Sequence, residues 1–213
     1  MSKDYEKLYS SEKSYWGSQP SDLVRRFAEF APTGRALDLG GGEGRDALFL
    51  AEEGFKATMV EIAEAGVERC RNRADEKGLQ IRAVCGDVRE FTIARNQYAL
   101  IACIALFQFM TKKDTAKLIR NCIDGLKRGG LLLCQTFTVD DPSLKVRRRK
   151  SREIAPGVFV DSSGGVYSLY DHGELLKLTV PLRPIYYHEY DFYDTARPPA
   201  HWHGVVDLVA KKM

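Results

Sequence analysis

The chain has 213 residues, of which 44% are apolar and 29% charged, and its formal net charge is +3. These values fit one globular domain with a sizeable core, and so small a charge does not by itself indicate a nucleic-acid partner. The polar start, Met1–Lys7, carries no secretory signal, and the longest apolar run, Ala99–Phe107, is about half as long as a membrane helix requires. We therefore expect a cytoplasmic protein without a membrane segment.

From residue 35 to 138 the pattern predicts strands that alternate with helices. The strands are expected at Arg35–Leu39, Lys56–Val60, Ile81–Cys85, Tyr98–Cys103 and Gly130–Phe137, and the helices at Gly44–Glu53, Ala63–Lys77 and Thr111–Lys127. Thr111 and Asp114 form a start similar to a capping box. Because the strands are apolar on both faces, we expect a parallel sheet covered by helices on both sides, with ligands at the carboxyl ends of the strands.

The remaining segments give weaker patterns. The first 30 residues are expected to be helical, and residues 155–170 to form a loop with short strand pieces. Residues 171–174 begin a short helix, and two final strands are expected at Ile185–Tyr193 and His203–Ala210.

The five cysteines are scattered, without a Cys-x-x-Cys pair, and we find no paired histidines beside them. This spacing favours free thiols in a reducing compartment over disulfides or zinc, so we predict no metal site. Core packing is the expected role of three cysteines that lie in apolar strands, Cys85, Cys103 and Cys134.

The most informative segment is Ala36–Arg45, where an apolar run ends in four glycines and is followed by a helical pattern. Glycine permits a sharp turn and the close approach of a ligand. The dinucleotide fingerprint fails, because its third glycine would fall on Arg45, and no Gly-Lys-Ser/Thr phosphate loop follows. Asp38, two residues before the first glycine, would repel phosphates and attract a cation. This pattern favours S-adenosylmethionine, which has an ammonium, a sulfonium and no phosphate.

Leu37–Arg45 resembles motif I of the class I S-adenosylmethionine-dependent methyltransferases, and further marks follow in the family's order. Glu61, at the end of the second strand, resembles the acid that binds the ribose hydroxyls, which is usually Asp. Gly86-Asp87-Val88 is similar to the adenine-binding turn. Leu126–Gly130 is similar to the turn into strand five, with Arg128 in place of the usual proline.

The resemblance covers residues 33–139 most strongly. It extends to the tellurite-resistance and thiopurine-type small-molecule methyltransferases through Gly-Arg-Asp after the glycines and the phrase Leu-Phe-Leu-Ala-Glu-Glu-Gly-Phe. It implies a doubly wound α/β fold with a seven-stranded, mostly parallel sheet of order 3-2-1-4-5-7-6 and an antiparallel last strand. It also implies one domain, 1–213, made of a helical lid (1–30), a cofactor-binding core (31–139) and a substrate-side loop with the C-terminal strands (140–213).

The resemblance further implies S-adenosylmethionine as cofactor and S-adenosylhomocysteine as product. Asp38 and the Cys103 carbonyl would face the ammonium, Arg45 the carboxylate, Glu61 the ribose, and the Asp87 turn the adenine. The expected cofactor-binding residues are Asp38, Gly40, Gly41, Gly42, Gly44, Arg45, Glu61, Ile62, Asp87, Val88 and Cys103.

Methyl transfer from a sulfonium is an in-line displacement in which positioning and exclusion of water supply most of the catalysis. We expect a small-molecule acceptor, such as a thiol or a chalcogen oxyanion. A soft nucleophile needs no base; otherwise His201, His203 or His172 is a candidate. Tyr15 and Trp16 are candidates for substrate contact or for packing in the lid.

Two alternatives stay open. The basic run at residues 145–152 is expected to be a solvated loop, yet it would also suit an RNA or protein methyltransferase. Against RNA, the run lacks interleaved aromatic residues, and Cys103–Phe107 lacks the Asn/Asp-Pro-Pro-Tyr/Phe segment of RNA amine methylators, so no nucleic-acid partner is expected. The third hypothesis is a cofactor-binding module without activity. The sequence leaves the oligomeric state open.

Overall fold

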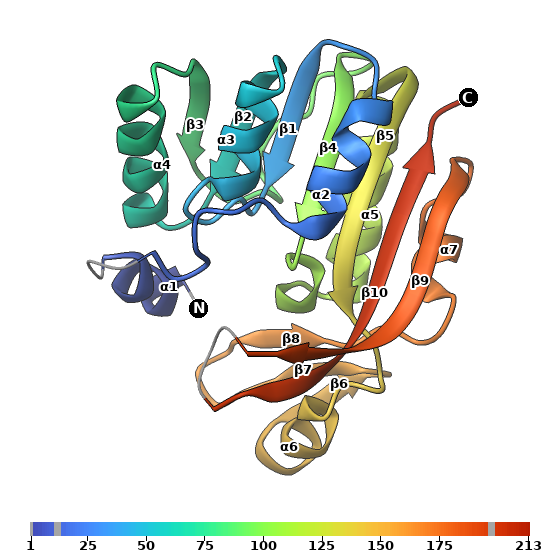
Figure 1. Cartoon of the computed structure of the whole chain (residues 1–213). Helices are drawn as coiled ribbons and strands as arrows, with labels where there is room; N and C mark the ends of the chain where they lie inside the picture. The colour runs from blue at the N-terminus through green and yellow to red at the C-terminus, as the bar shows by residue number, and fades with distance from the viewer. Residues whose placement is uncertain (1, 11–13, 196–198) are drawn as a thin grey trace.

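The computed structural model describes residues 2–10, 14–195 and 199–213 (Figure 1). The α-helices are α1 (Ser2–Tyr9), α2 (Asp22–Phe27), α3 (Arg45–Glu52), α4 (Glu64–Glu76), α5 (Lys112–Gly125), α6 (Ser143–Lys150) and α7 (Glu174–Leu178). The strands are β1 (Arg35–Leu39), β2 (Lys56–Glu61), β3 (Ile81–Cys85), β4 (Tyr98–Ile104), β5 (Leu126–Phe137), β6 (Arg152–Ala155), β7 (Val158–Val160), β8 (Val166–Ser168), β9 (Arg183–Asp194) and β10 (His201–Lys211).

Seven strands form the main sheet, in the order β3-β2-β1-β4-β5-β10-β9. β1 to β5 pair in parallel, and β10 is antiparallel to both β5 and β9. Figure 1 shows this directly, because the arrowheads of the parallel strands point down and that of β10 points up. The predicted order 3-2-1-4-5-7-6 and the antiparallel last strand are confirmed.

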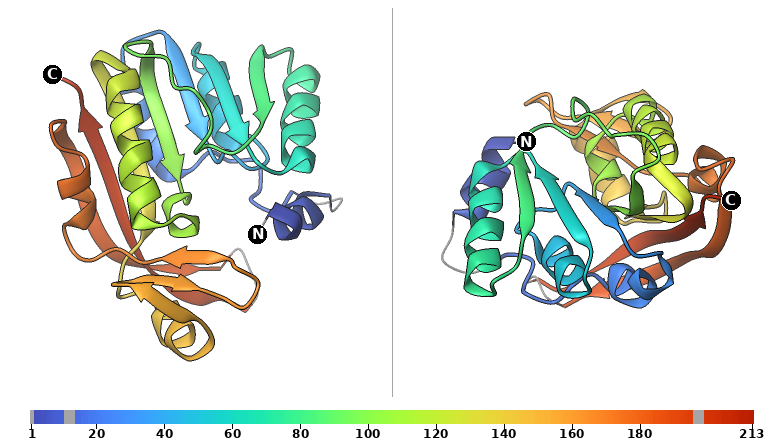
Figure 2. Two further views of the ribbon diagram at one scale, coloured as in Figure 1. Left: turned by 180° about the vertical axis from the view of Figure 1, so that it is seen from behind. Right: turned by 90° about the horizontal axis from the view of Figure 1, so that it is seen from above.

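Helices cover the sheet on both faces (Figure 2). One apolar cluster joins sheet residues such as Ile101 and Leu132 to α5 and α7 through Leu118 and Leu175. Two further clusters join the opposite face to α2, α3 and α4. The strands between these layers are apolar on both faces because each must bury both sides, and β4 is buried along its whole length.

The start of α5 follows from its sequence. Thr111 is the N-cap, and its hydroxyl oxygen accepts a hydrogen bond from the Asp114 backbone amide at 3.1 Å, as the capping pattern predicts. The helix ends at Gly125, and β5 begins directly at Leu126, earlier than the predicted Gly130. Residues 127–130 bulge out of the pairing, because Tyr98 faces Leu126 while Leu100 faces Leu131.

The predicted helical lid is only partly helical. α1 and α2 are helices, but the described residues between them, 14–21, form bends and irregular backbone. Glu6 on α1 accepts a hydrogen bond from the Ala65 amide at the start of α4, with a separation of 3.1 Å. This contact fixes α1 beside the carboxyl end of β2.

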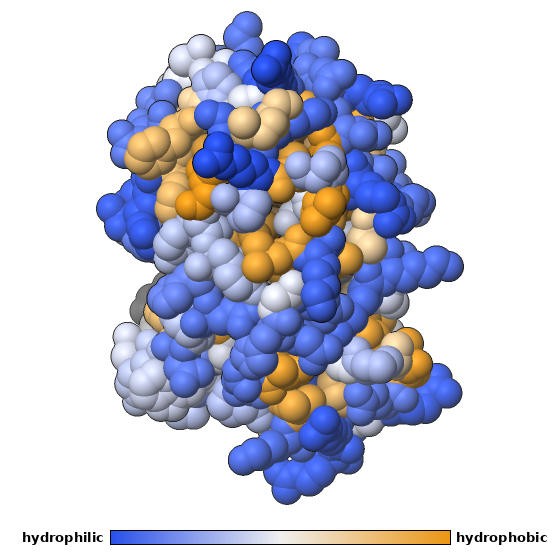
Figure 3. Space-filling view, turned by 90° about the vertical axis from the view of Figure 1, so that its right-hand side faces the viewer, coloured by the Kyte–Doolittle hydropathy of each residue, from blue (hydrophilic) through white to orange (hydrophobic). Residues whose placement is uncertain are grey.

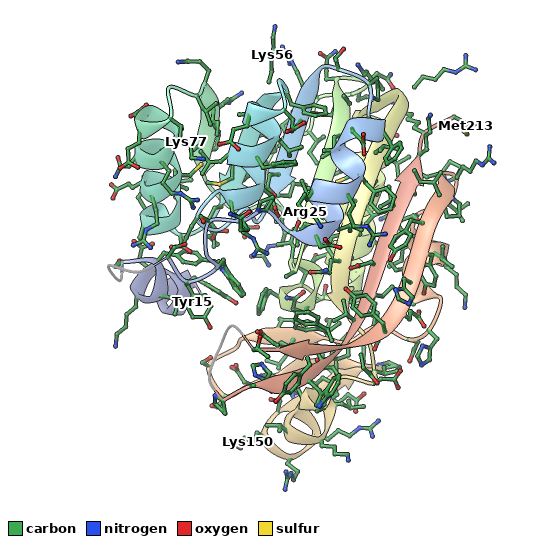
Figure 4. All side chains as sticks on the ribbon, viewed as in Figure 1. Tyr15, Arg25, Lys56, Lys77, Lys150 and Met213 are labelled. Carbon is green, nitrogen blue, oxygen red and sulfur yellow. The ribbon has the colours of Figure 1, made fainter. Side chains whose placement is uncertain are left out.

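A second sheet, β6-β7-β8, follows β5 and was not predicted beyond short strand pieces. The basic run is also not the expected loop, because most of it forms α6, whose residues are all at least partly exposed. Figure 4 shows Lys150, the last residue of α6, at the opposite end of the molecule from Lys56 at the start of β2. Arg148 and Arg149 are exposed, whereas the Arg147 guanidinium packs over the Tyr167 ring at 3.9 Å.

One prediction about the cysteines is wrong. Cys103 and Cys134 are buried, as expected, but Cys85 is exposed. β3 is an edge strand of the sheet, so its last residue does not have a neighbouring strand on both sides.

No helix among the described residues has the length and apolarity to cross a membrane. Figure 3 shows the face on the β9 side, where apolar patches are interrupted by hydrophilic side chains. Exposed apolar residues near this edge include Val180 and Ile185.

Candidate active site

A cavity of about 390 Å³ lies at the carboxyl ends of the parallel strands. Four strands reach the cavity at their carboxyl ends. Glu61 and Ile104 are the last residues of β2 and β4, and Gly40 and Gly86 directly follow β1 and β3. The lining residues are Tyr5, Tyr9, Trp16, Asp38, Gly40, Gly41, Gly42, Arg45, Asp46, Glu61, Ile62, Gly86, Asp87, Val88, Arg89, Ile104, Ala105, Leu106, Phe109, Met110, Ser163, Gly164, Gly165 and Val166. The predicted position of the site and most of its predicted residues therefore meet in one place.

The glycine turn has two separate requirements for glycine. Gly42 has φ +57°, and a Cβ there would lie 3.0 Å from the Tyr9 hydroxyl oxygen, so the turn is packed under the N-terminal segment. Gly44 has φ +83° and does not line the cavity; its Cβ would lie 2.3 Å from the Cys70 sulfur. Gly44 is thus required by the packing of α3 on α4, whereas Gly40, Gly41 and Gly42 face the cavity.

Asp38 is the best-defined charged group of the cavity. Its side chain is 2% exposed, and its Oδ2 atom has no hydrogen-bond partner among the described residues. Burial raises the pKa of the Asp38 carboxyl well above its ordinary value, and the nearby Asp46 carboxylate raises it further. A buried acid with an unsatisfied oxygen at a ligand cavity is suited to a cation, because the cation would offset the cost of ionising it.

Glu61 ends β2 and is 6% exposed. Its Oε2 accepts from the Gly42 amide and its Oε1 from the Ala63 amide, both at 3.0 Å. Burial raises the pKa of Glu61, while the hydrogen bonds from Ala63 and Gly42 oppose the rise. Each carboxylate oxygen has further lone pairs, so the group can accept from two ligand hydroxyls while it holds the glycine turn.

Asp87 and Val88 follow β3 and line the cavity beside Ile62. The Asp87 carboxylate is already paired with Arg89, whose Nε lies 2.9 Å from both of its oxygens. The Arg89 guanidinium lowers the pKa of Asp87. Asp87 is therefore ionised at neutral pH and keeps lone pairs that can accept from a ligand amino group.

The segment after α1 closes one side of the cavity. The indole nitrogen of Trp16 donates to the Tyr9 hydroxyl at 3.0 Å, and the Trp16 amide donates to Glu43 at the same distance. Arg45 donates to the Trp16 carbonyl at 3.2 Å. Glu43 is 1% exposed and also pairs with Arg69 on α4. The glycine turn, α4 and this segment are thus tied together.

The opposite side of the cavity is mainly apolar. Leu106, Phe109 and Met110 follow β4, and the turn between β7 and β8, residues 163–166, faces them. The Ser168 hydroxyl donates to the Met110 carbonyl at 2.6 Å, and the Phe109 ring contacts Tyr167 edge-on, with centroids 6.2 Å apart. The small second sheet is therefore anchored on this apolar wall.

The structure separates several predicted residues from the cavity. Cys103 lies in the core, because β4 runs one residue further, and Ile104 and Ala105 occupy the end of the strand. Tyr15 is 37% exposed and does not line the cavity, although its neighbour Trp16 does; Figure 4 shows Tyr15 at the N-terminal segment. None of the three candidate bases lines the cavity either: His172, His201 and His203.

Other lining residues were not predicted. Asp46, in the first turn of α3, accepts from the Ser21 amide at 2.6 Å and lies close enough to Asp38 to raise its pKa. Asp46 belongs to the Gly44-Arg45-Asp46 segment that resembles the family, but the sequence predicted no role for it. Phe109 and the turn at residues 163–166 carry no local pattern that would mark them, since only the tertiary fold brings them to the cavity.

Comparisons with known proteins agree with this geometry. Residues 36–130 match a family model described as a methyltransferase domain. A ubiquinone biosynthesis O-methyltransferase of Coxiella burnetii is 30% identical over 101 residues, which are 47% of this chain and 42% of that protein. The probable S-adenosyl-L-methionine-dependent methyltransferase TehB of Haemophilus influenzae is 25% identical over 134 residues, 62% of this chain and 46% of that protein. The chain thus matches less than half the length of these relatives.

Solved structures share the fold across nearly the whole chain. The crystal structure of Haemophilus influenzae TehB superimposes with a TM-score of 0.71 at 18% identity, over 98% of this chain and 66% of that one. A Burkholderia thailandensis 1,6-didemethyltoxoflavin-N1-methyltransferase, solved with bound 1,6-didemethyltoxoflavin and S-adenosylhomocysteine, gives a TM-score of 0.71 at 18% identity, over 100% of this chain and 87% of that one. Residues 36–130 therefore match a methyltransferase domain, and the chain is similar in sequence and in fold to TehB.

Proposed function

We propose that the protein transfers the methyl group of S-adenosylmethionine to a small apolar acceptor through a soft nucleophile, first of all a thiol. The observation that carries the cofactor part of the proposal is Asp38, a buried carboxylate under the glycine turn whose Oδ2 has no hydrogen-bond partner in the described part of the chain. A dinucleotide or nucleoside triphosphate would bring phosphates against this acid, whereas the ammonium of S-adenosylmethionine would neutralise it.

The lining residues can hold each part of this cofactor. Asp38 would bind the ammonium and Arg45 the carboxylate. Glu61 would accept from the ribose hydroxyls, and Asp87 with the Val88 amide would bind the adenine. The cofactor supplies an activated methyl group with a neutral leaving group, so the protein needs to align the acceptor and keep water out.

The acceptor part of the proposal rests on the composition of the cavity. Among its lining residues there is no histidine, lysine or cysteine that could serve as a general base. Tyr9 is not a base either, because burial raises the pKa of its hydroxyl far above neutrality. Around Phe109 and Met110 the wall is apolar. A thiol fits both conditions, because it ionises near neutral pH without help and can carry an apolar substituent.

The test has two stages, both with the full chain. Calorimetric titration with S-adenosylmethionine and S-adenosylhomocysteine measures binding, and transfer of labelled methyl groups to thiols, tellurite, selenite and phenols measures activity. We expect saturable binding and turnover of apolar thiols, with kcat/KM rising with pH through the pKa of each thiol itself. Turnover of phenols with a pH profile independent of the acceptor would mean that the protein supplies a base, and would refute the thiol assignment.

Phe109 offers a check on the apolar wall. Replacing Phe109 by alanine should lower kcat/KM for the acceptor by about tenfold or more, since loss of an apolar contact of this size is worth about 1–3 kcal/mol, while the cofactor Kd stays unchanged. Phe30, which is 59% exposed, provides the matched control. An equal loss of cofactor affinity in Phe109→Ala would show that this side of the cavity does not hold the acceptor.

The alternatives have distinct outcomes. Binding of the cofactor without turnover of any acceptor would indicate a module without activity. Steeply salt-dependent RNA binding that disappears when residues 147–149 on α6 are replaced would favour an RNA methyltransferase. The predicted cytoplasmic location and single-domain organisation remain predictions.

A further inference from the structure

The hairpin of β9 and β10 brings three metal-ligating side chains together at the end where the chain connects the two strands. Asp194 and His201 are direct partners in the antiparallel register, so they lie on the same face of the hairpin. His203 lies two residues further along β10 and therefore on that same face. One donor atom from each of the three residues lies within 4.8 Å of the others.

The histidines are held in the orientation that metal ligands adopt. His203 Nδ1 lies 2.8 Å from Asp141 Oδ2, and His201 Nδ1 lies 2.8 Å from the Pro199 carbonyl oxygen. Because a carbonyl only accepts, His201 Nδ1 carries the hydrogen, which leaves Nε2 as a lone-pair donor. Metal-binding histidines are oriented by the same kind of bond from the second ring nitrogen to a carboxylate or carbonyl.

His203 provides a second, independent observation. Its Nε2 atom is buried and has no hydrogen-bond partner among the described residues. The ring is held in place by Phe137, which stacks on it with centroids 4.5 Å apart and an interplanar angle of 4°. Asp141 is bound in turn by the Ser143 amide at 2.8 Å. A buried imidazole nitrogen without a hydrogen-bond partner costs free energy unless a ligand binds to it.

From this geometry we propose that the protein binds one divalent transition-metal ion through Nε2 of His201, Nε2 of His203 and the Asp194 carboxylate. Two imidazoles and one carboxylate suit Zn²⁺, Co²⁺, Ni²⁺ or Fe²⁺ better than Mg²⁺ or Ca²⁺, which prefer oxygen ligands. Ligand atoms on tetrahedral zinc lie about 3.3 Å apart, given bonds of about 2.0–2.1 Å. Closing from 4.8 Å requires movements of roughly 1.5 Å or less, within the reach of side-chain rotation.

The site goes beyond the proposed methyl transfer, because none of its three ligands lines the cavity. The ion would join the last residue of β9 to the first part of β10. Asp141 would act as a positioning residue, since it reaches the ion only through His203.

The experiment uses the full chain freed of metal, titrated with Zn²⁺ by calorimetry and with Co²⁺ by absorption spectroscopy. We expect one equivalent of Zn²⁺, a rise in Tm on adding it, and Co²⁺ d–d bands without thiolate charge-transfer absorption. The double variant His201→Ala/His203→Ala should lose stoichiometric binding and the rise in Tm. Asp141→Asn should weaken binding about 10- to 100-fold, the usual effect of removing such a partner.

The matched control is His172→Ala/His188→Ala, which removes the chain's other two histidines and should bind zinc as the unaltered protein does. Thiolate charge-transfer bands, or binding that disappears with Cys85→Ser, would place the ion at the exposed cysteine and overturn the proposal. The proposal is also overturned if the protein binds Zn²⁺ more weakly than free imidazole does, or if Zn²⁺ still binds after His201 and His203 are replaced. If the double variant does not fold, the Co²⁺ spectrum of the unaltered protein and the Asp141→Asn affinity decide the question.

Discussion

Replacing Asp38 by asparagine should change cofactor affinity and the stability of the ligand-free protein in opposite directions. Asp38 is 2% exposed, and its Oδ2 lacks a hydrogen-bond partner among the residues that the structure describes. Burial, together with the Asp46 carboxylate, raises the pKa of Asp38. Asparagine has the same shape and keeps one oxygen as an acceptor, but it carries no charge and presents an amide to the cavity. The substitution therefore removes the charge while it preserves the packing.

The magnitude on the binding side follows from the loss of one hydrogen bond to a charged group, worth about 1.5–3 kcal/mol. Because about 1.4 kcal/mol corresponds to a factor of ten in an equilibrium constant, the Kd of S-adenosylmethionine should rise roughly 10- to 150-fold. S-adenosylhomocysteine should lose affinity to the same extent, since it has the same ammonium group and lacks only the methyl.

On the stability side, a carboxyl whose pKa is raised in the folded state binds more protons folded than unfolded. The protein therefore loses stability as pH rises from the ordinary pKa of Asp38, 3.8, to its raised value, and the whole deficit persists above that value. The asparagine variant has no such deficit at this position. Its Tm without ligand should equal or exceed that of the unaltered protein at neutral pH, and the difference should shrink toward pH 4.

Calorimetric titration and thermal unfolding between pH 4 and 8 measure both quantities on the same samples. Asp22→Asn is the control, because Asp22 is 62% exposed in its ion pairs with Arg25 and Arg26, and surface pairs contribute little. If Asp38→Asn lowers the Tm of the ligand-free protein at neutral pH, or leaves the cofactor Kd unchanged, the argument from an unpartnered buried acid is wrong.

Other substitutions test the rest of the site. Glu61→Ala should weaken cofactor binding by about 1–3 kcal/mol, because it removes the proposed acceptors of the ribose hydroxyls; calorimetry measures the change. Gly44→Ala should lower the free energy of unfolding by about 2–5 kcal/mol in denaturant titrations, because it adds left-handed strain and a clash with Cys70. Cofactor affinity should increase as pH rises through the raised pKa values of Asp38 and Glu61, because the bound state requires both ionised, and affinity titrations across pH detect this.

For each of these three predictions, one outcome would contradict the reasoning. Equal affinity of Glu61→Ala and the unaltered protein would remove the ribose assignment, and Glu61→Gln separates the loss of charge from the loss of the bonds to Gly42 and Ala63. Unchanged stability of Gly44→Ala would show that α3 and α4 can shift apart. A cofactor affinity that stays constant with pH in both the unaltered protein and Asp38→Asn would mean that neither acid titrates with binding.

The sequence by itself determined the α/β core and the cofactor half of the site, because these depend on local patterns. Apolar runs and helical periodicity placed β1 to β5 and the helices between them, apart from residues 127–130, where a bulge merged the turn with the strand. The glycine turn, Glu61 and Asp87 stand at strand ends, and parallel strands bring their carboxyl ends to one edge of the sheet. The resemblance to the methyltransferases then supplied the strand order, which nothing local encodes.

Only the tertiary structure decided what depends on contacts between distant segments. Residues 163–166 reach the cavity because a small antiparallel sheet folds over the end of β4, where Phe109 lies. Cys85 is exposed because its strand lies at an edge. His201 and His203 appeared unpaired along the chain, yet the register of β9 with β10 places Asp194 directly opposite His201, on the face that His203 shares. Side chains separated by one residue share a face of a strand, and the partner that completes such a group comes from another strand.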